Sequence, residues 1–421
     1  CSRHLTAYVF VLIYSMIKSI AVIIMKYLLL CLSICIIWTK ADDSTGKVPP
    51  RMLYPNIYNI CEDASKVLVV IESRGHFDSL FYLWSALESP VLIIALTKPE
   101  ASLNINCSKF NSSQFEDSIK FSDTPTFTSA FQLINIIEYQ DRKDLADLEQ
   151  VDPSDVAVYD ATLFDWQYRV TSGALSAYSF TANTYNHTNI SDSTGISVEF
   201  HPNGYQEREK ISPCLFYTTN SSLVRLVLDG VVLPTSSNVS RLGARMVTLT
   251  GDPDNNVYSY HHHKTLDDEY SPTVFDMFEL ITPALGSGER HFYQWRPVSF
   301  TKPEHDVNYA TDLRHYEARA VSAAPLKYST RLLQAVMGDI GDLRVTAWNV
   351  TCGVQEDGFY AATNFTDWTF LTGYGTPVQD TYSLYVAILT ASCIVAPSIL
   401  SLIGVPAIMI WKSWKRRAAL V

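Results

Sequence analysis

The sequence predicts a mainly β protein, in which a β-sandwich-like region is joined to one C-terminal transmembrane helix. Short apolar runs rich in β-branched residues recur through the middle of the chain, between turns that contain Gly, Pro and Asn. Helix signals are sparse in the same region. Near the C-terminus, one long stretch has no charged residue, which is typical of a helix that crosses a bilayer.

The first half of the region contains two continuous apolar runs, 66–72 (KVLVVIE) and 91–97 (VLIIALT). Such runs are typical of strands that are covered on both faces. Residues 129–139 fit either a short helix or a long strand, and we favour the strand. The polar segment 188–213 predicts a loop, at which the region could divide into two subdomains.

The second half predicts further strands and a tight turn. In 223–233 (LVRLVLDGVVL), the Asp229-Gly230 pair between apolar runs predicts a β-hairpin. Residues 274–281 are the best candidate for a helix. Other strands are expected at 245–250, 344–352 and 364–371.

The strand at 344–352 carries a glycosylation motif at Asn349, which must be exposed if it holds a glycan. Successive side chains of a strand point to opposite faces. Thr346, Trp348 and Val350 are therefore expected to face the core.

The N-terminal end predicts a secretory signal peptide at 25–41. It has a basic residue after Met25, an apolar run, and small residues before the acidic pair that follows. Residue 1 is Cys, so 1–24 is interpreted as a leader or a non-native extension. The alternative is a transmembrane helix over 7–24, although Lys18 interrupts its apolar run.

The C-terminal stretch 384–410 is the predicted transmembrane helix, since about 20 apolar residues suffice to cross a bilayer. A buried core helix fits neither its length nor its flanking charges. Basic clusters beside a span stay on the cytoplasmic side. Residues 411–421 are therefore predicted as a cytoplasmic tail and 42–381 as a lumenal region, in type I topology. The basic residues of the tail are Lys412, Lys415, Arg416 and Arg417.

One face of the predicted span is made of small residues, which allow another helix to approach closely. Two prolines in the span predict a kink that a neighbouring helix would help to satisfy. This pattern suggests docking against a partner membrane protein, and chance is the alternative. The small residues of this helix-contact face are Ala387, Ala391, Ser398 and Ser401.

The lumenal region is acidic, with 24 basic residues against 43 acidic residues and a balance near −19. This charge excludes nucleic acid as an expected partner, because phosphate binding requires the opposite sign. Four cysteines lie in the region and predict two disulfides in an oxidising compartment. Three pairings are open, and the favoured one joins Cys61 to Cys107 and Cys214 to Cys352.

Eight Asn-x-Ser/Thr motifs lie in the predicted lumenal region, too many to be an accident of composition. A transferred glycan is bulky and must project from the surface, so these side chains are expected to be exposed. Glycans at all of them would shield much of the backbone from proteases. The motifs begin at Asn106, Asn111, Asn186, Asn189, Asn220, Asn238, Asn349 and Asn364.

No motif for an enzyme, a metal or a cofactor is present in the sequence, so none of these is expected. The run His261, His262 and His263 could bind a metal or respond to pH, but adjacent residues of an extended segment point to opposite sides. An exposed loop is the preferred interpretation. The acidic cluster 267–269 offers a carboxylate pair for hydrolysis, and a solvated loop is again preferred.

Several segments resemble the glycosylated lysosomal membrane protein family, in the same order and from about residue 66 to the predicted span. The pair formed by the first two is the most specific. The segments are 267–270 (DDEY), 294–298 (QWRPV), 82–85 (YLWS), 348–351 (WNVT) and 368–373 (WTFLTG).

The resemblance implies a single-pass type I protein of the lysosomal membrane without catalytic activity. It also implies an accessory role, in which the protein binds a lysosomal dipeptide transporter of the major facilitator superfamily and protects it from proteases. Family tails carry a tyrosine-based sorting signal, and 411–421 contains no Tyr. A homodimer stays open. The alternatives are a membrane-anchored lysosomal hydrolase that uses Asp267, Asp268 or Glu269, and an adhesion or receptor glycoprotein of the cell surface.

Overall fold

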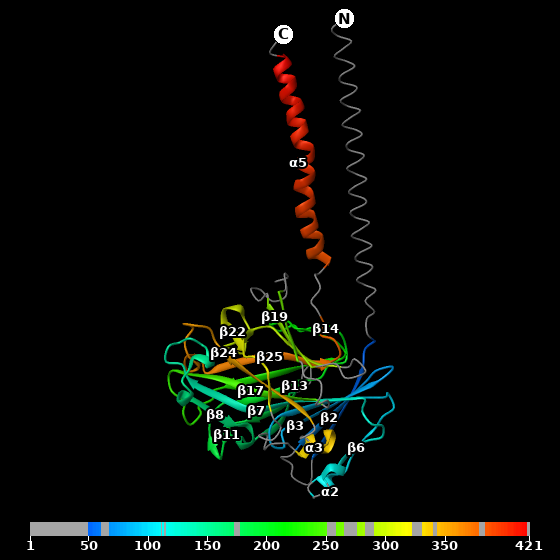
Figure 1. Ribbon diagram of the computed structural model, residues 1–421, viewed down its shortest axis with the longest axis vertical. Helices are drawn as coiled ribbons and strands as arrows, with labels where there is room; N and C mark the ends of the chain where they lie inside the picture. The colour runs from blue at the N-terminus through cyan, green and yellow to red at the C-terminus, as the bar shows by residue number, and fades with distance from the viewer. Residues whose placement is uncertain are drawn as a thin grey trace. The chain divides into compact units, whose positions relative to one another are not determined.

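The computed structural model describes residues 49–59, 67–110, 112, 115–171, 177–250, 258–264, 276–282, 290–321, 331–339, 343–378 and 384–418. One compact unit, Val48–Gln379, contains the strands described below, and the C-terminal segment belongs to another unit (Figure 1). The predicted extension 1–24 and the predicted signal peptide 25–41 lie outside the described residues.

The strands of the larger unit form two antiparallel layers. The first layer is built on a central long strand, β7, to which β8 (Val156–Asp160) pairs beyond the end of β4. β22 (Ala310–His315) and β23 (Arg319–Val321) extend it beside β24. Its main order is β1 (Met52–Asn59), β2 (Val67–Arg74), β3 (Ser79–Ser85), β4 (Val91–Thr97), β7 (Phe127–Gln140), β17 (Ser240–Thr250) and β24 (Arg344–Cys352).

The second layer has β25 near its middle. β25 pairs with β16 along one edge, and with β20 and the short β21 (Val298–Phe300) along the other. Its order is β9 (Gln167–Thr171), β10 (Ala177–Ala182), β13 (Gly195–His201), β16 (Ser221–Asp229), β25 (Phe365–Tyr374), β20 (His291–Trp295), β19 (Asp276–Ile281) and β18 (Ser259–Lys264).

The β21–β22 pair connects the two layers, since β21 pairs with β25 and β22 pairs with β24. The remaining elements are short and lie in connections. The small strand pairs are β5 (Leu103–Ile105) with β6 (Ile119–Phe121), β11 (Thr184–Tyr185) with β12 (Thr188–Asn189), and β14 (Glu207–Arg208) with β15 (Phe216–Tyr217). The short helices are α2 (Cys107–Phe110), α3 (Arg331–Met337), α4 (Tyr360–Thr363) and the 3-10 turns η1 (Phe115–Asp117), η2 (Leu148–Gln150), η3 (Pro153–Asp155), η4 (Ala161–Leu163) and η5 (Val307–Tyr309).

An aromatic core fills the space between the two layers. Trp84 of the first layer lies 5.4 Å from Phe180 of the second, and Phe131 lies 5.4 Å from Phe370, measured between ring centroids. Trp84 also donates a hydrogen bond of 2.9 Å to the carbonyl of Tyr178. Because large aromatic side chains interdigitate between two sheets, the predicted sandwich is confirmed.

A second apolar cluster covers the outer face of the first layer. Leu332 and Leu333 of α3 pack there against Leu68, Phe81 and Ile93. β2, β3 and β4 are therefore buried on both faces, which explains their uninterrupted apolar runs and confirms the prediction for 66–72 and 91–97. The same cover buries Val345 of β24, while Trp348 and Val350 face the core between the layers as predicted.

Several predicted elements are confirmed, and three differ. β7, β17, β24 and β25 lie where strands are expected. The expected loop 188–213 instead contains β13, which pairs on both edges, and the larger unit has no division there. The expected helix 274–281 is wrong, because its described part forms strand β19.

The expected hairpin at Asp229-Gly230 is also wrong. β16 ends at Asp229, and the chain then crosses to the other layer, where β17 begins at Ser240. The apolar side chains after the turn are buried in the crossover itself, with Val231 and Leu233 each 2% exposed. The apolar run on the far side of Gly230 is therefore part of the core without being a strand.

The C-terminal helix α5 (Leu384–Ala418) covers the whole of 384–410 and continues beyond it. The helical part of that prediction is confirmed. None of the helices in the described part of the chain meets the combined length and hydropathy that a membrane crossing requires.

Candidate functional site

The predicted glycosylation sites fall into two groups in the structure. Asn111 lies outside the described residues. Asn220 and Asn349 are half-buried, and their Oδ1 atoms accept hydrogen bonds of 3.0 Å from Nε of Arg51 and Nε of Arg245 respectively. The other described sites have exposed side chains, as expected: Asn106, Asn186, Asn189, Asn238 and Asn364.

Three loops that carry exposed sites meet at one end of the sandwich. The amide of Val232 donates to the carbonyl of Ile190 at 2.7 Å, which joins the crossover loop to the segment after Asn189. The amide of Gly230 donates to the carbonyl of Asn364, also at 2.7 Å. The same crossover loop carries Asn238. Four glycosylation sites, counting Asn186, are thus gathered at the end where β25 begins.

Asn220 lies at the opposite end of β25. Its carbonyl accepts a hydrogen bond of 2.9 Å from the amide of Tyr374, the last residue of that strand. A strand rises about 3.3 Å per residue, so the nine steps along the ten residues of β25 separate the two ends by about 30 Å. The connection from β4 to β7, which carries exposed Asn106, also joins the end where β25 stops, since Phe127 lies 5.5 Å from Tyr374 between ring centroids.

The predicted disulfides have different outcomes. Cys214 and Cys352 have free thiols, so the bridge between them is not present in the structure. Their neighbours differ, because Ser299 bonds to the Cys352 thiol, whereas Glu209 and Arg208 lie near that of Cys214. Burial raises the pKa of Cys352 to about 12. Cys61 lies outside the described residues, and its pairing with Cys107 stays a prediction.

The histidine run forms part of an edge strand, β18, and its side chains diverge. His262 Nε2 lies 2.6 Å from Asp276 Oδ1, and His263 Nε2 lies 3.2 Å from Glu279 Oε2. The expected loop is therefore a strand, and the expected divergence is confirmed. Within the described residues, no group of side chains is arranged to hold a metal ion. The acidic cluster Asp267, Asp268 and Glu269 lies outside them.

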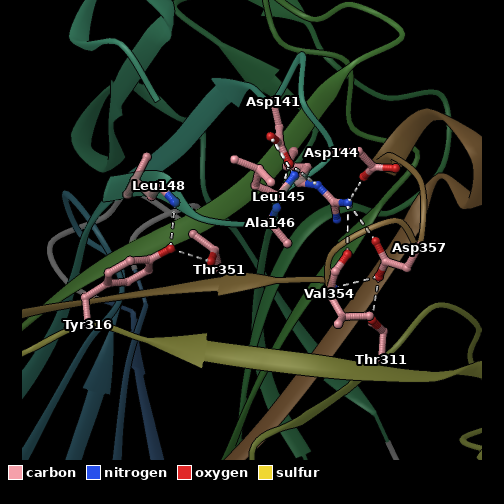
Figure 2. Close-up of polar contacts among 11 residues, drawn as sticks. Asp141, Asp144, Leu145, Ala146, Leu148, Thr311, Tyr316, Thr351, Val354 and Asp357 are labelled. Atoms are coloured by element: carbon pink, nitrogen blue, oxygen red, sulfur yellow. Dashed lines mark hydrogen bonds and ion pairs between the residues drawn. The ribbon is translucent and has the colours of Figure 1, made fainter. Parts of the chain in front are cut away.

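A buried arginine of β17 organises the most connected polar cluster, which we call the Arg241 clamp (Figure 2). Arg241 Nε donates to Asp141 Oδ2 at 2.8 Å, and Nη2 donates to Asp357 Oδ1 at 2.7 Å and to Asp144. The Arg241 side chain is 4% exposed, whereas those of Asp144 and Asp357 are 27% and 24% exposed. The clamp joins one strand to two loops that are far away in the sequence.

Two of the three carboxylates of the clamp, Asp141 and Asp357, are themselves fixed by backbone amides. Asp141 accepts from the amides of Leu145 at 3.0 Å and Ala146 at 2.7 Å. Asp357 accepts from the amide of Val354 at 2.9 Å and from the hydroxyl of Thr311 at 2.7 Å, as Figure 2 shows. The carboxylates of Asp141 and Asp357 therefore have partners besides Arg241, which fix their positions.

Burial alone would lower the pKa of Arg241, but the hydrogen bond to Asp357 and its charge outweigh burial and raise it. Gly353 is required beside the clamp. Its φ of +116° suits glycine, and any side chain at this position would collide with the Arg241 guanidinium. The clamp thus acts as a structural brace of two loops.

Another arginine, whose side chain is 25% exposed, lies in the other layer, in what we call the Arg225 cluster. Asp367 is fully buried and accepts from Arg225 Nε at 2.6 Å. His305 Nε2 lies 2.8 Å from the same carboxylate, and His305 Nδ1 lies 2.6 Å from the carbonyl of Ser212. Burial would raise the pKa of Asp367, but the hydrogen bonds from His305 and Arg225 lower it.

Glu209 is the second carboxyl group of the Arg225 cluster, and its pKa shifts in the direction opposite to that of Asp367. Its Oε2 atom is buried and has no hydrogen-bond partner among the described residues. Burial raises the pKa of Glu209 to about 8, although the charges of His305 and Arg225 oppose this. Glu209 is therefore protonated at neutral pH, while Asp367 is charged.

Neither cluster is predicted by a motif of the sequence. A signal was present for the Arg225 cluster, because Arg225 and Asp367 interrupt apolar runs that read as strands. A charge at an inward position of a strand requires an opposite charge on a neighbouring strand. Arg225 and Asp367 lie diagonally on β16 and β25, where Arg225 pairs with Thr369 and Val227 pairs with Asp367.

Comparison with known proteins points to the family that the sequence segments resemble. The sequence profile of the family described as glycosylated lysosomal membrane protein matches residues 67–416. Glycosylated lysosomal membrane protein A of Xenopus laevis is 28% identical over 81% of this chain and 85% of its own length. The proteins of that name from Bos taurus and Homo sapiens are 27% and 25% identical, over 81% and 80% of this chain and 84% and 82% of their own. The chain therefore belongs to the glycosylated lysosomal membrane protein family.

Proposed function

We propose that this chain is a non-enzymatic accessory subunit that binds a lysosomal dipeptide transporter of the major facilitator superfamily and protects it from lumenal proteases. The observation that carries the proposal is the family match over 67–416, which makes the chain a lysosomal membrane glycoprotein. The accessory role, the transporter and a homodimer go beyond what the relatives' names say. Type I topology belongs to the same proposal.

In this proposal, residues 384–410 form the membrane anchor. The sequence has no charge there, and four basic residues follow within 412–417, which favours a span whose tail is cytoplasmic. α5 is helical over the whole of 384–410, which supports a helix-contact face made of Ala387, Ala391, Ser398 and Ser401. Such a face suits close packing against another helix in a bilayer.

The arrangement of glycosylation sites supports a shield. Glycans at Asn186, Asn189, Asn238 and Asn364 would cover one end of the sandwich, where three loops meet. Loops are the preferred sites of proteolytic cleavage, so sugar at these positions protects the segments that need it.

The test is co-purification of the full-length chain from detergent-solubilised lysosomal membranes, followed by mass spectrometry. We expect a transporter with many spans to be recovered. A variant in which 384–410 is replaced by an unrelated apolar span separates contact through the helix from contact through the sandwich. Repeated recovery of the intact chain without any transporter would contradict the proposal.

A further inference from the structure

A cavity opens between the two layers of the sandwich, close to the edge strand β18. Its volume is about 350 Å³, within the range of small-molecule sites. Tyr260 and Trp295 line it from the second layer, while His315 and Trp348 line it from the first. Trp295 and Trp348 form a buried, stacked pair with ring centroids 5.5 Å apart. The cavity walls are therefore mostly flat aromatic faces.

Three ring nitrogens that line this cavity are buried and have no hydrogen-bond partner among the described residues. Two are the indole Nε1 atoms of Trp295 and Trp348, which are donors. The third is Nδ1 of His315, whose Nε2 bonds to the hydroxyl of Tyr260, so that Nδ1 donates or accepts according to the tautomer of the ring. Burial lowers the pKa of His315 to about 4, which keeps this ring neutral above that pH.

Unpaired buried donors are costly, at about 1–3 kcal/mol each, so they point to a ligand that supplies acceptors. A carboxylate is available at the rim, because Glu317 is exposed and lines the same cavity. The site thus offers aromatic faces, two unpaired indole donors, the unpaired Nδ1 atom of His315 and a carboxylate acceptor at the rim. A cation would leave both indole donors unpaired, and so would a purely apolar ligand.

We propose that this cavity binds the ring of a neutral pyranose sugar. The apolar C–H face of such a ring packs flat against Tyr and Trp, its oxygens accept hydrogen bonds from the indole N–H groups, and a hydroxyl pairs with His315 Nδ1 in either tautomer. A sugar hydroxyl donates to Glu317. The proposal does not depend on the accessory role, since it concerns sugar recognition by the sandwich and no contact with a transporter.

The test uses the full-length protein in a detergent without a sugar headgroup. The probes are methyl glycosides of N-acetylglucosamine, mannose and galactose, and tetramethylammonium is the cationic control. Binding is measured by titration calorimetry and by saturation-transfer NMR. We expect saturable binding of at least one glycoside and none of tetramethylammonium.

Two variants and a matched control locate the site. Trp348→Phe removes one donor and should weaken binding by about 2- to 10-fold, the value of one hydrogen bond. Glu317→Gln, at an exposed position, should weaken it by a similar factor without unfolding the protein. Trp368→Phe changes another buried Trp whose Nε1 is unpartnered but which does not line the cavity, and it should leave affinity unchanged.

Three results would overturn the proposal. The first is no binding of any glycoside by protein whose thermal unfolding is normal. The second is preference for tetramethylammonium, which would make the cavity an aromatic cage for cations. The third is equal weakening by Trp348→Phe and Trp368→Phe, which would place the bound sugar elsewhere.

Discussion

The Arg241 clamp and the Arg225 cluster each join an arginine to carboxyl groups, but in different ways. In the clamp, three carboxylates surround Arg241, and those of Asp144 and Asp357 keep about a quarter of their surface in water. In the Arg225 cluster, the Asp367 side chain is 0% exposed and the second buried carboxyl, Glu209, is held protonated. Excess negative charge is kept where water reaches it, and is removed by a proton where water does not.

The largest expected effect is from Arg225→Met, which tests the Arg225 cluster. It leaves the buried Asp367 carboxylate with His305 as its remaining charged partner. We expect a loss of about 3–5 kcal/mol in the free energy of unfolding, the usual cost of an uncompensated buried charge. Urea unfolding followed by Trp fluorescence measures it.

The double variant Arg225→Met with Asp367→Asn is the control for that prediction, because it removes both charges. It should recover part of the lost stability. If the double variant were less stable than Arg225→Met alone, the buried charge of Asp367 would not be the cause of the loss.

Arg241→Met tests the Arg241 clamp and should lower the free energy of unfolding by less, about 2 kcal/mol in the same measurement. Asp144 and Asp357 can be hydrated, and Asp141 retains its two backbone amides. The matched control is Arg142→Met, which breaks an exposed pair with Asp155 at 2.8 Å and should change nothing measurable. A loss as large as that of Arg225→Met would contradict the comparison.

The smallest effect is a pH dependence that belongs to Glu209. Its pKa is raised on folding to about 8, so the stability that it contributes is present at low pH and lost as pH rises through 8. Between pH 6.5 and 8 the slope is at most about 1.4 kcal/mol per pH unit. Glu209→Gln should flatten this slope, leaving the part due to His305, whose pKa is also raised despite burial.

Below pH 6.5 the sign reverses because of two buried histidines. Burial lowers the pKa of His291 to about 3 and that of His315 to about 4. Stability that depends on a neutral histidine is present above pH 6.5 and is lost as pH falls. Thermal unfolding across pH 4 to 8 should therefore show a maximum near 6.5, and a flat profile in the wild-type protein would refute both assignments.

The strands that could be predicted are those whose own residues indicate how they are buried. The runs that form β2 and β4 are apolar on both faces, so burial on both sides could be inferred locally. β13 was missed because polar residues interrupt its segment, and its pairing partners β10 and β16 decide its state. The short apolar run of β19 fits a helix or a strand equally well until β20 pairs with it.

The same distinction applies to the sites. A glycosylation motif is complete within three residues, so exposure at Asn106 or Asn364 could be expected from the sequence alone. The Arg241 clamp joins residues that are 100 and 116 positions apart, and no local pattern connects Arg241 to Asp141 or Asp357. The half-burial of Asn349 has the same origin, because Arg245 on the neighbouring strand covers it.

β25, the last strand of the sandwich before α5, is hydrogen-bonded along both edges, to β16 on one side and to β20 and β21 on the other. A tensile load applied to its C-terminal end is therefore shared by two rows of hydrogen bonds, which must shear together. An edge strand under the same load would peel away one bond at a time. The sandwich is thus attached to its C-terminal segment through a strand that is held along both edges.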